Sequence, residues 1–358
     1  IDENGSPVYL TPKMDKQEEI YTQAMQYLDD AIADLQKEDL IDPEAQDLLY
    51  QGDAEKWLKL AYDLRTRYTM HLLKRSANKD ADMEKVLEYV NNSFESAEEQ
   101  AAFDVYDANN INPLYGFFVA RAGLGASESM RSKLAEYNDP RLSRAFITKQ
   151  GTSGKEQAPG TADNAVYAPN GSPEQGTSKY GTSLFMYSIS APTLLLSYHE
   201  LKFLEAEALC RLERDAKSAL KDAVVAGLLN AENSFTISRK ELGKTLINAA
   251  SSITEAEAES YFDNTIEAKY TAEPLKTTMT QKYFALWGAS GEATESYNDV
   301  RRMKGLGENF IELKNPNSFP LRCPYGNSDT TTNAEVKAAY GNGQYVYSEN
   351  VWWAGGSR

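Results

Sequence analysis

The stretch APTLLLSYHELKFLEAEALCRL, residues 191–212, decides the fold class. Its apolar residues recur at the spacing of one helix face, and Pro192 stands near the start, where a missing N–H costs a helix least. These apolar residues are Leu194, Leu195, Tyr198, Leu201, Leu204, Ala208 and Leu212. The pattern predicts one amphipathic helix over Ala191–Leu212, with a buried side.

Helical patterns also fill the region before residue 107. Apolar stripes predict helices over Gln17–Leu35, from Gly52-Asp53 to about Leu72, and over Met83–Phe94. Asp15 is the expected N-cap of the first helix. Three consecutive amphipathic helices with short polar connections predict stacked hairpins of tetratricopeptide type, although the chain carries no clean repeat of roughly 34 residues.

The rest of the chain adds more helices and few strand signals. Helices are expected over Lys217–Asn230, over Thr254–Phe262 with an extension to Tyr270, and over Thr278–Trp287; the chain is expected to turn irregular after Arg302. We therefore predict a mainly α fold, in which tetratricopeptide-like helical hairpins support a loop-rich face with little β-structure.

The expected organisation is one body with four segments. Residues 1–107 form the helical hairpins, 108–190 a loop-rich ligand-facing segment, 191–305 the C-terminal helices and 306–358 an irregular end. Within 108–190 turn residues are frequent, and only Ser127–Tyr137 has a helical pattern. Because aromatic residues punctuate this segment, we expect an ordered, loop-built surface rather than a linker.

Composition excludes several functions. The 358 residues include 37 Lys and Arg against 53 Asp and Glu, a formal net charge of −16. Such an acidic chain repels phosphate backbones and anionic membrane surfaces, so nucleic acid is not an expected partner. No apolar run reaches the roughly 18 residues that a transmembrane helix needs. The 22 tyrosines suit a wet, amphipathic binding surface.

Catalytic and metal motifs are absent or incomplete. Residues 151–156, GTSGKE, lack the spacing of a phosphate-binding loop, and His199-Glu200 is followed by Phe203 where a zinc helix needs its second histidine. His71 and His199 are the only histidines and are expected to be structural. We therefore predict no catalytic residues, no metal ligands and no cofactor.

Several short motifs, in order along nearly the whole chain, resemble the SusD/RagB family of Bacteroidetes outer-membrane lipoproteins. Each motif alone is weak, but six or seven in order are specific, and the main departure is His199, where alanine is usual. The matching stretches are DKQEEIY (15–21) with LDDAI (28–32), YQGDAEKW (50–57) with LRTRY (64–68), NDPRL (138–142), SYHELKFLEAEA (197–208), QKYFALW (281–287) with ESYNDVRR (295–302), FPLR (319–322) with PY (324–325) and Asn333, and WW (352–353).

The resemblance implies a function and a location. Members are non-catalytic binding proteins held on the cell surface by an N-terminal lipidated cysteine, and they pass oligosaccharides, or in some members peptides, to a SusC-like TonB-dependent porin. The lipid anchor and first helices of a full member would lie upstream of Ile1. The motif residues themselves are expected to be structural, with Arg301 and Arg302 near Asp299, and Glu205 and Glu207, in buried ion pairs.

Aromatic and planar polar residues of segment 108–190 are the expected ligand contacts. Sugars stack their C–H faces on aromatic rings and pair their hydroxyls with planar polar groups. We expect Tyr167 and Tyr180 to be stacking platforms, Arg121 to pair with hydroxyls, and Tyr115, Asn170 and Tyr187 to contribute. Asp and Asn side chains there could hold a structural calcium, but no ligand spacing locates such a site.

Two other functions stay open at this level. Helical hairpins present concave faces that bind extended peptides, and the acidic surface would favour basic ones. A secreted glycoside hydrolase needs only two well-placed carboxylates, which 53 acidic residues permit. A non-catalytic glycan-binding protein is nevertheless the leading hypothesis.

Overall fold

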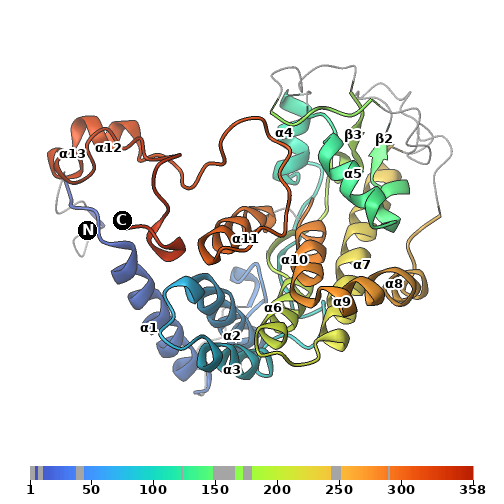
Figure 1. The fold of residues 1–358 in the computed structure, drawn as a ribbon, viewed down its shortest axis with the longest axis horizontal. Helices are drawn as coiled ribbons and strands as arrows, with labels where there is room; N and C mark the ends of the chain where they lie inside the picture. Colours follow the sequence, from blue (N-terminus) through green and yellow to red (C-terminus); the bar gives the residue numbers. More distant parts are fainter. Residues whose placement is uncertain are drawn as a thin grey trace.

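The computed structural model describes residues 5–6, 11–37, 44–121, 124–147, 166–171, 180–242, 251–288 and 291–357, the side chains of Ala45 and Arg121 excepted. These residues are mostly helical (Figure 1). The α-helices are α1 (Gln17–Leu35), α2 (Ala54–His71), α3 (Lys79–Val90), α4 (Pro113–Arg121), α5 (Glu128–Glu136), α6 (Tyr198–Arg211), α7 (Lys217–Leu242), α8 (Glu255–Tyr261), α9 (Glu267–Ala272), α10 (Pro274–Ala285), α11 (Ala293–Leu306), α12 (Asn327–Thr332) and α13 (Ala334–Tyr340).

Short elements complete the described part of the chain. Two antiparallel strand pairs occur there, β1 with β4 and β2 with β3, so the prediction of a mainly α fold with little β-structure is confirmed. The strands are β1 (Ala101–Phe103), β2 (Phe146–Ile147), β3 (Thr182–Ser183) and β4 (Thr193–Leu196). The 3₁₀ turns are η1 (Glu44–Gln46), η2 (Leu72–Lys74), η3 (Pro140–Ser143), η6 (Leu184–Tyr187) and η9 (Trp352–Ala354), and η8 (Phe262–Ile266) is a π-helix.

Helix α6 is the centre of the fold, because it packs against α2, α3, α7 and α10. It begins at Tyr198, where the Ser197 side chain accepts a hydrogen bond from the backbone N–H of Glu200. The prediction of one helix from Ala191 is therefore wrong at its start. Leu194 and Leu196 belong instead to β4 and pair with β1, so the apolar run before Ser197 is a strand.

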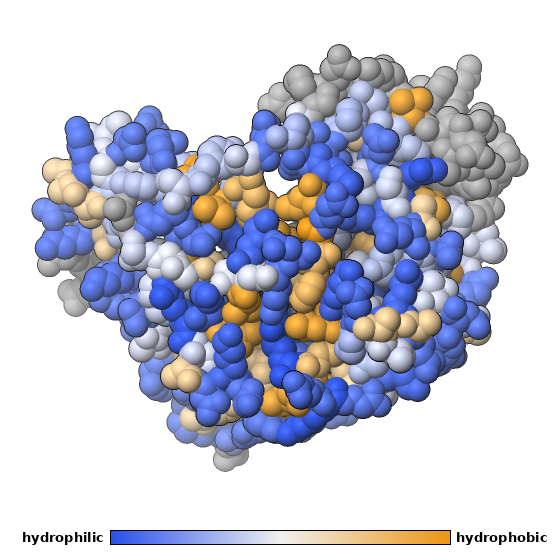
Figure 2. Space-filling view, in the orientation of Figure 1, coloured by the Kyte–Doolittle hydropathy of each residue, from blue (hydrophilic) through white to orange (hydrophobic). Residues whose placement is uncertain are grey.

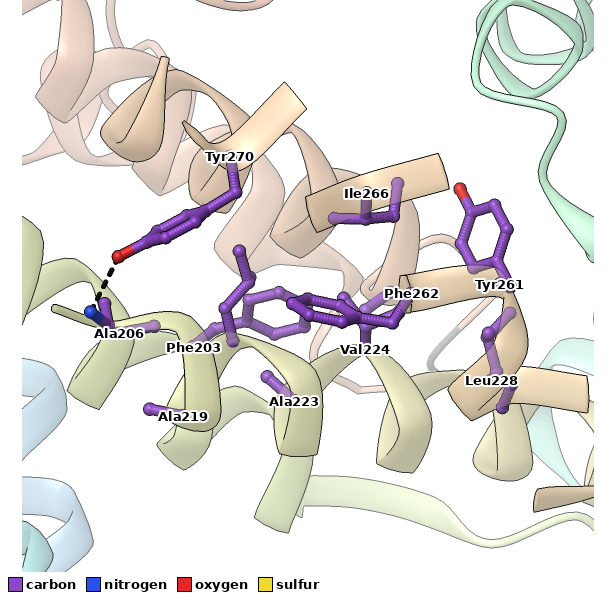
Figure 3. Packing of buried hydrophobic residues seen from close by; sticks show 14 of the residues in the cluster. Phe203, Ala206, Ala219, Ala223, Val224, Leu228, Tyr261, Phe262, Ile266 and Tyr270 are labelled. Carbon is purple, nitrogen blue, oxygen red and sulfur yellow. Dashed lines mark hydrogen bonds between the residues drawn. The ribbon is translucent and has the colours of Figure 1, made fainter. Parts of the chain in front are cut away.

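The main core lies where α6 and α7 meet α8, η8 and α9 (Figure 3). Phe203 of α6 and Phe262 of η8 pack together beside small α7 residues such as Ala223, and each of these three is at most 1% exposed. Tyr270 closes one end, where its hydroxyl accepts the backbone N–H of Ala216 at 2.7 Å. The helices from Glu255 to Ala272 run on continuously through η8, which confirms the expected extension to Tyr270.

The N-terminal helices form the predicted hairpins: α1 packs on α2, α2 on α3, and α3 on α6. The N-cap of α1 is Lys16 without a side-chain cap, so the prediction of Asp15 is wrong. The C-terminal end of the chain returns to these helices, as Figure 1 shows. There Trp353 stacks on His71 at 5.6 Å between ring centroids, and Trp352 contacts Tyr21 at 6.4 Å.

In three regions the structure contains more helix than the sequence predicted. Helix α4 is new, because Asn112, expected to mark a turn with Pro113, caps a helix and accepts the backbone N–H of Leu114 at 2.8 Å. Helix α7 continues past Asn230 to Leu242. The end of the chain is not all irregular either: it contains α12 and α13, and Asn333 caps α13.

Buried ion pairs join α6 to α2, α10 and α11. Arg302 is fully buried and donates to Glu207 at 2.7 Å and to Asp299 at 2.8 Å, which confirms the expected pairs of these residues. Arg301 instead lies over the Tyr297 ring, and Glu205 pairs with Lys202 within α6. The expectation of buried ion pairs is therefore wrong for Arg301 and Glu205.

A second group of buried charges surrounds Glu200. Arg67 donates to Glu200 at 3.1 Å and to Glu292 at 3.1 Å, while the ammonium of Lys282 lies 3.4 Å from Glu200. Burial, followed by the negative charge of Glu200, raises the pKa of Glu292 to about 8. Asp63 is also fully buried, and the desolvation of its carboxyl raises its pKa well above the usual range.

The two histidines differ. His71 is buried, with its Nε2 2.7 Å from Oε2 of Glu295 and its Nδ1 3.2 Å from the Tyr21 hydroxyl, so the prediction of a structural histidine is confirmed. His199 is 1% exposed, and Oε2 of Glu292 lies 3.9 Å from its Nε2, too far for a hydrogen bond. Burial lowers the pKa of His199 to about 4, so its ring is neutral at neutral pH.

Candidate functional site: a polar and aromatic pocket beside the loop-rich segment

An open pocket of about 470 Å³ lies between α5, α10 and the segment 309–314. Figure 1 shows the chain after α11 running past α10. We refer to it as the α5–α10 pocket. It is lined by Ser129, Ser132, Lys133, Glu136, Tyr137, Lys276, Thr280, Phe284, Asn309, Phe310, Ile311, Glu312 and Lys314.

Two helix faces build the walls of this pocket. Ser129, Ser132, Lys133 and Glu136 recur at the spacing of one face of α5, whose start is fixed by the Ser127 cap. The α10 side contributes Lys276, Thr280 and Phe284, each four residues after the one before. The third wall, 309–314, follows the left-handed Gly307 that ends α11.

The loop 166–171 ties the loop-rich segment to this third wall. The amide oxygen of Asn170 accepts the Ser127 hydroxyl at 2.8 Å, and its amide nitrogen donates to Asn315 at 3.2 Å. Asn170, a predicted ligand contact, thus holds the start of α5 and the end of the pocket wall together.

Tyr167 lies in the same loop and is half-buried. Its ring meets the edge of Phe146 at 5.2 Å, and the Arg131 guanidinium lies 5.6 Å from its centroid. Both contacts hold the ring, and the part of it that remains exposed is the part open to a ligand.

The pocket is suited to a neutral polar ligand with apolar faces. Tyr137 and Phe310 supply aromatic surface, and Tyr137 meets the fully buried Phe284 edge to face at 5.3 Å. Its cations and carboxylates are close to balance, since three lysines face two glutamates. Lys133 donates to Ser129 at 2.7 Å, and its partial burial lowers the pKa of its ammonium.

The other predicted contacts lie elsewhere. Tyr115 and Tyr187 line a small cavity of about 150 Å³ with Phe118, and neither of them lines the α5–α10 pocket. Tyr180 and Tyr187 are each 4% exposed. Their rings are packed in the protein interior, and this contradicts their expected role as exposed stacking surfaces. The side chain of Arg121 is outside the described part.

The sequence did not predict that residues of α10 and of segment 309–314 line the α5–α10 pocket. These residues lie far along the chain from segment 108–190, and nothing local marks Thr280 or Asn309 as a partner of α5. Phe310 carried the one available signal, because it is an aromatic residue shortly after the helix-ending Gly307.

The face of the molecule shown in Figure 2 is mostly hydrophilic. Figure 2 shows hydrophobic residues gathered over α10, α11 and the chain that follows α11. Within the described residues no group of three or more His, Cys, Asp and Glu side chains is placed to hold a metal ion. Among the described helices, none is both long enough and apolar enough to span a bilayer.

The fold and the pocket define a tetratricopeptide-like helical scaffold with an open polar and aromatic pocket beside its loop-rich segment. A sequence model of the SusD-like family, described as "Starch-binding associating with outer membrane", matches residues 3–325. A SusD/RagB family protein from Bacteroides thetaiotaomicron, of known crystal structure, is 66% identical. Its TM-score is 0.94, and the match covers 97% of this chain and 75% of that protein. The chain therefore belongs to the SusD/RagB family, as the motifs predicted.

More distant structures share the fold. A SusD homologue from Bacteroides fragilis is 20% identical with a TM-score of 0.71, and the match covers 96% of this chain and 76% of the homologue. A chitin-binding protein is 21% identical with a TM-score of 0.70, and the match covers 98% of this chain and 75% of that protein. Comparison with the curated proteins finds no match.

Proposed function

We propose that this protein is a non-catalytic glycan-binding protein of the outer membrane surface, which captures oligosaccharides and passes them to a SusC-like TonB-dependent porin. Its place in the SusD/RagB family supports the class of function, since the matching sequence model is described as starch-binding and associated with the outer membrane. A lipid anchor upstream of Ile1 would hold it at the surface.

The α5–α10 pocket is the observation that carries the proposal for this chain. Its volume of about 470 Å³ lies in the usual range for small-molecule sites. Phe310 offers an apolar face to sugar C–H groups, while Ser132 and Asn309 offer hydroxyl and amide partners to sugar hydroxyls. Because lysines and glutamates nearly balance, the pocket favours an uncharged sugar over an ion.

Two of the predicted residues keep a role in this proposal. Asn170 positions the wall 309–314 through Asn315, and Tyr167 extends the aromatic surface next to α5. Tyr115 lies on α4, outside the pocket, and remains a second place of contact for a longer glycan.

Binding to a panel of soluble glycans tests the proposal. Affinity electrophoresis and calorimetry would compare the protein with Phe310→Ala, Asn309→Ala and a control, Phe117→Ala. Phe117 is 53% exposed on α4 and outside the pocket, so it matches the loss of an aromatic ring without touching the site. We expect one glycan class to bind without release of sugar, and Phe310→Ala to weaken it about tenfold.

Two results would contradict the proposal. Release of reducing sugar would indicate a hydrolase, and binding of peptides with no glycan binding would indicate a peptide receptor. The transfer step has its own test: a full-length tagged protein should co-purify from outer membranes with a TonB-dependent porin, and its recovery without any porin would refute that step.

A further inference from the structure

A second open pocket, of about 370 Å³, lies beyond the C-terminal end of α5 and shares no lining residue with the α5–α10 pocket. Its walls come from η3, the segment 251–253, α8 and η8. We refer to it as the η3–α8 pocket. It is lined by Asn138, Pro140, Ser143, Arg144, Ser251, Ser252, Ile253, Glu257, Ser260, Tyr261, Asn264 and Thr265.

The two pockets are neighbours at the end of α5. Tyr137 lines the α5–α10 pocket, and the next residue, Asn138, lines the η3–α8 pocket. Helix α9 lies between α8 and α10 (Figure 1), and the ammonium of its Lys269 lies 4.4 Å from the centroid of the Tyr137 ring. In addition, Arg141 of η3 donates to the backbone carbonyl of Phe284 at 2.7 Å, which fixes a wall of one pocket to a wall of the other. Tyr137 and Lys269 therefore stand at the boundary between the two pockets.

The charged residues of the η3–α8 pocket are engaged within the protein. Among its described lining residues, only Arg144 and Glu257 are charged. Arg144 donates to Glu232 at 2.8 Å, and Glu257 accepts the backbone N–H of Thr254 at 2.9 Å in the capping box of α8. Uncharged groups therefore decide which ligand this pocket suits.

The uncharged lining combines hydroxyls and amides with apolar surface. The hydroxyls and amides belong to Asn138, Ser143, Ser251, Ser252, Ser260, Asn264 and Thr265, and the apolar surface to Pro140, Ile253 and Tyr261. A neutral sugar has the matching groups, because its hydroxyls donate and accept hydrogen bonds and its C–H faces pack on apolar surface.

Asn138 and Thr265 are the polar residues with the most to gain from such a ligand. Both are partly buried, and neither side chain forms a hydrogen bond with a described residue. By contrast, Ser143 donates to the backbone carbonyl of Pro140, and Asn264 donates to that of Ser260. Because a partly buried polar group without a partner is unfavourable, sugar hydroxyls that bind Asn138 and Thr265 would be stabilised there.

We infer that the η3–α8 pocket is a second subsite for the glycan bound in the α5–α10 pocket, with Asn138 and Thr265 binding hydroxyls of the sugar units beyond Tyr137. The inference rests on the proposed function, because it extends the site at Phe310. It specifies the substrate class as a long, uncharged oligosaccharide, since a short one occupies only one of the two pockets.

Calorimetry with maltotriose and maltoheptaose, and with mannotriose and mannohexaose, tests the inference, because each pair is a short and a long member of one uncharged series. If another glycan of the panel binds instead, its own short and long fragments are compared. Asn138→Gly removes the amide, and glycine accepts the left-handed backbone of this position, where φ is 48°. The matched control is Glu213→Gly, at a φ of 55° in the turn after α6 and outside both pockets. Thr265→Val removes the hydroxyl from another wall of the pocket.

For the series that binds, we expect Asn138→Gly and Thr265→Val each to weaken the long oligosaccharide about fivefold, because each removes one hydrogen bond, and to leave the short one unchanged. Glu213→Gly should change neither affinity. An unchanged affinity for the long oligosaccharide in both variants, or an equal loss for both lengths, would overturn the inference.

The same titrations separate this inference from the proposed function. If Phe310→Ala weakens both lengths while Asn138→Gly and Thr265→Val weaken neither, the proposed function stands and the second subsite does not. If no glycan of the panel binds at all, both are refuted.

Discussion

Replacing Arg302 by methionine should lower the stability of the folded protein strongly, because the substitution breaks buried ion pairs. The guanidinium is fully buried at the contact of α6 with α11, where its Nη2 donates to Oε2 of Glu207 and Oδ1 of Asp299. Burial raises the pKa of the Glu207 carboxyl, but the charges of Arg302 and Arg211 outweigh it and hold that pKa well below its usual range. The substitution Arg302→Met keeps most of the side-chain volume but leaves two buried carboxylates facing each other.

The size of the stability loss depends on the cations that remain beside Glu207 and Asp299. Removing one partner of a buried ion pair costs about 3–5 kcal/mol. Here Arg211 stays 2.8 Å from Glu207, and Lys282 stays 2.9 Å from Asp299. Because both carboxylates keep one cation, we expect the lower end, about 3 kcal/mol of the free energy of unfolding.

Urea unfolding followed by circular dichroism measures this loss, and Arg214→Met is the matched control. Arg214, in the turn between α6 and α7, pairs with Glu84 of α3, but both side chains are about half exposed, at 49% and 50%. Exposed pairs contribute about 0–1 kcal/mol. If the two variants lose the same stability, the reasoning from burial is wrong.

Three further outcomes are expected. Glu292 has a pKa of about 8 in the folded protein against an ordinary 4.5, so the folded state holds a proton that the unfolded chain has released. The contribution of Glu292 to stability should then fall by up to about 1.4 kcal/mol per pH unit from about pH 6.5 toward pH 8, and Glu292→Gln should remove this part of the slope in urea titrations, while the part due to Asp63 remains. Gly288 and Gly307 both have positive φ, but a Cβ at Gly288 would lie 2.3 Å from the Phe185 ring and one at Gly307 would meet nothing. Gly288→Ala should therefore lower the thermal midpoint clearly more than Gly307→Ala, and equal shifts would contradict the packing. Asn170→Ala should weaken glycan binding without changing the fold, since it releases the wall 309–314 from α5; unchanged calorimetric affinity would show that this link does not support the site.

The sequence predicted the helices with clear periodicity. α1 has the predicted bounds, and α8 begins with the capping box of Thr254 and Glu257. Failures occurred where another pattern competed. The apolar run before Ser197 suits a strand as well as a helix, and only its pairing with β1 decides between them.

The sites were harder to predict, because their residues meet through the tertiary fold. The buried pairs of Arg302 with Glu207 and of Arg67 with Glu292 join residues 95 and 225 positions apart. In the same way, the α5–α10 pocket needs α10 and Phe310 beside α5. Tyr180 was a reasonable choice by residue type, but tyrosine serves cores as well as surfaces, and here it is buried.

A crystal structure of the protein with the oligosaccharide that retards it in affinity electrophoresis tests the central claim most directly. We predict a sugar ring against Phe310 in the α5–α10 pocket, with hydroxyls in hydrogen-bond reach of Ser132 and Asn309. A sugar bound elsewhere with this pocket empty would contradict the account.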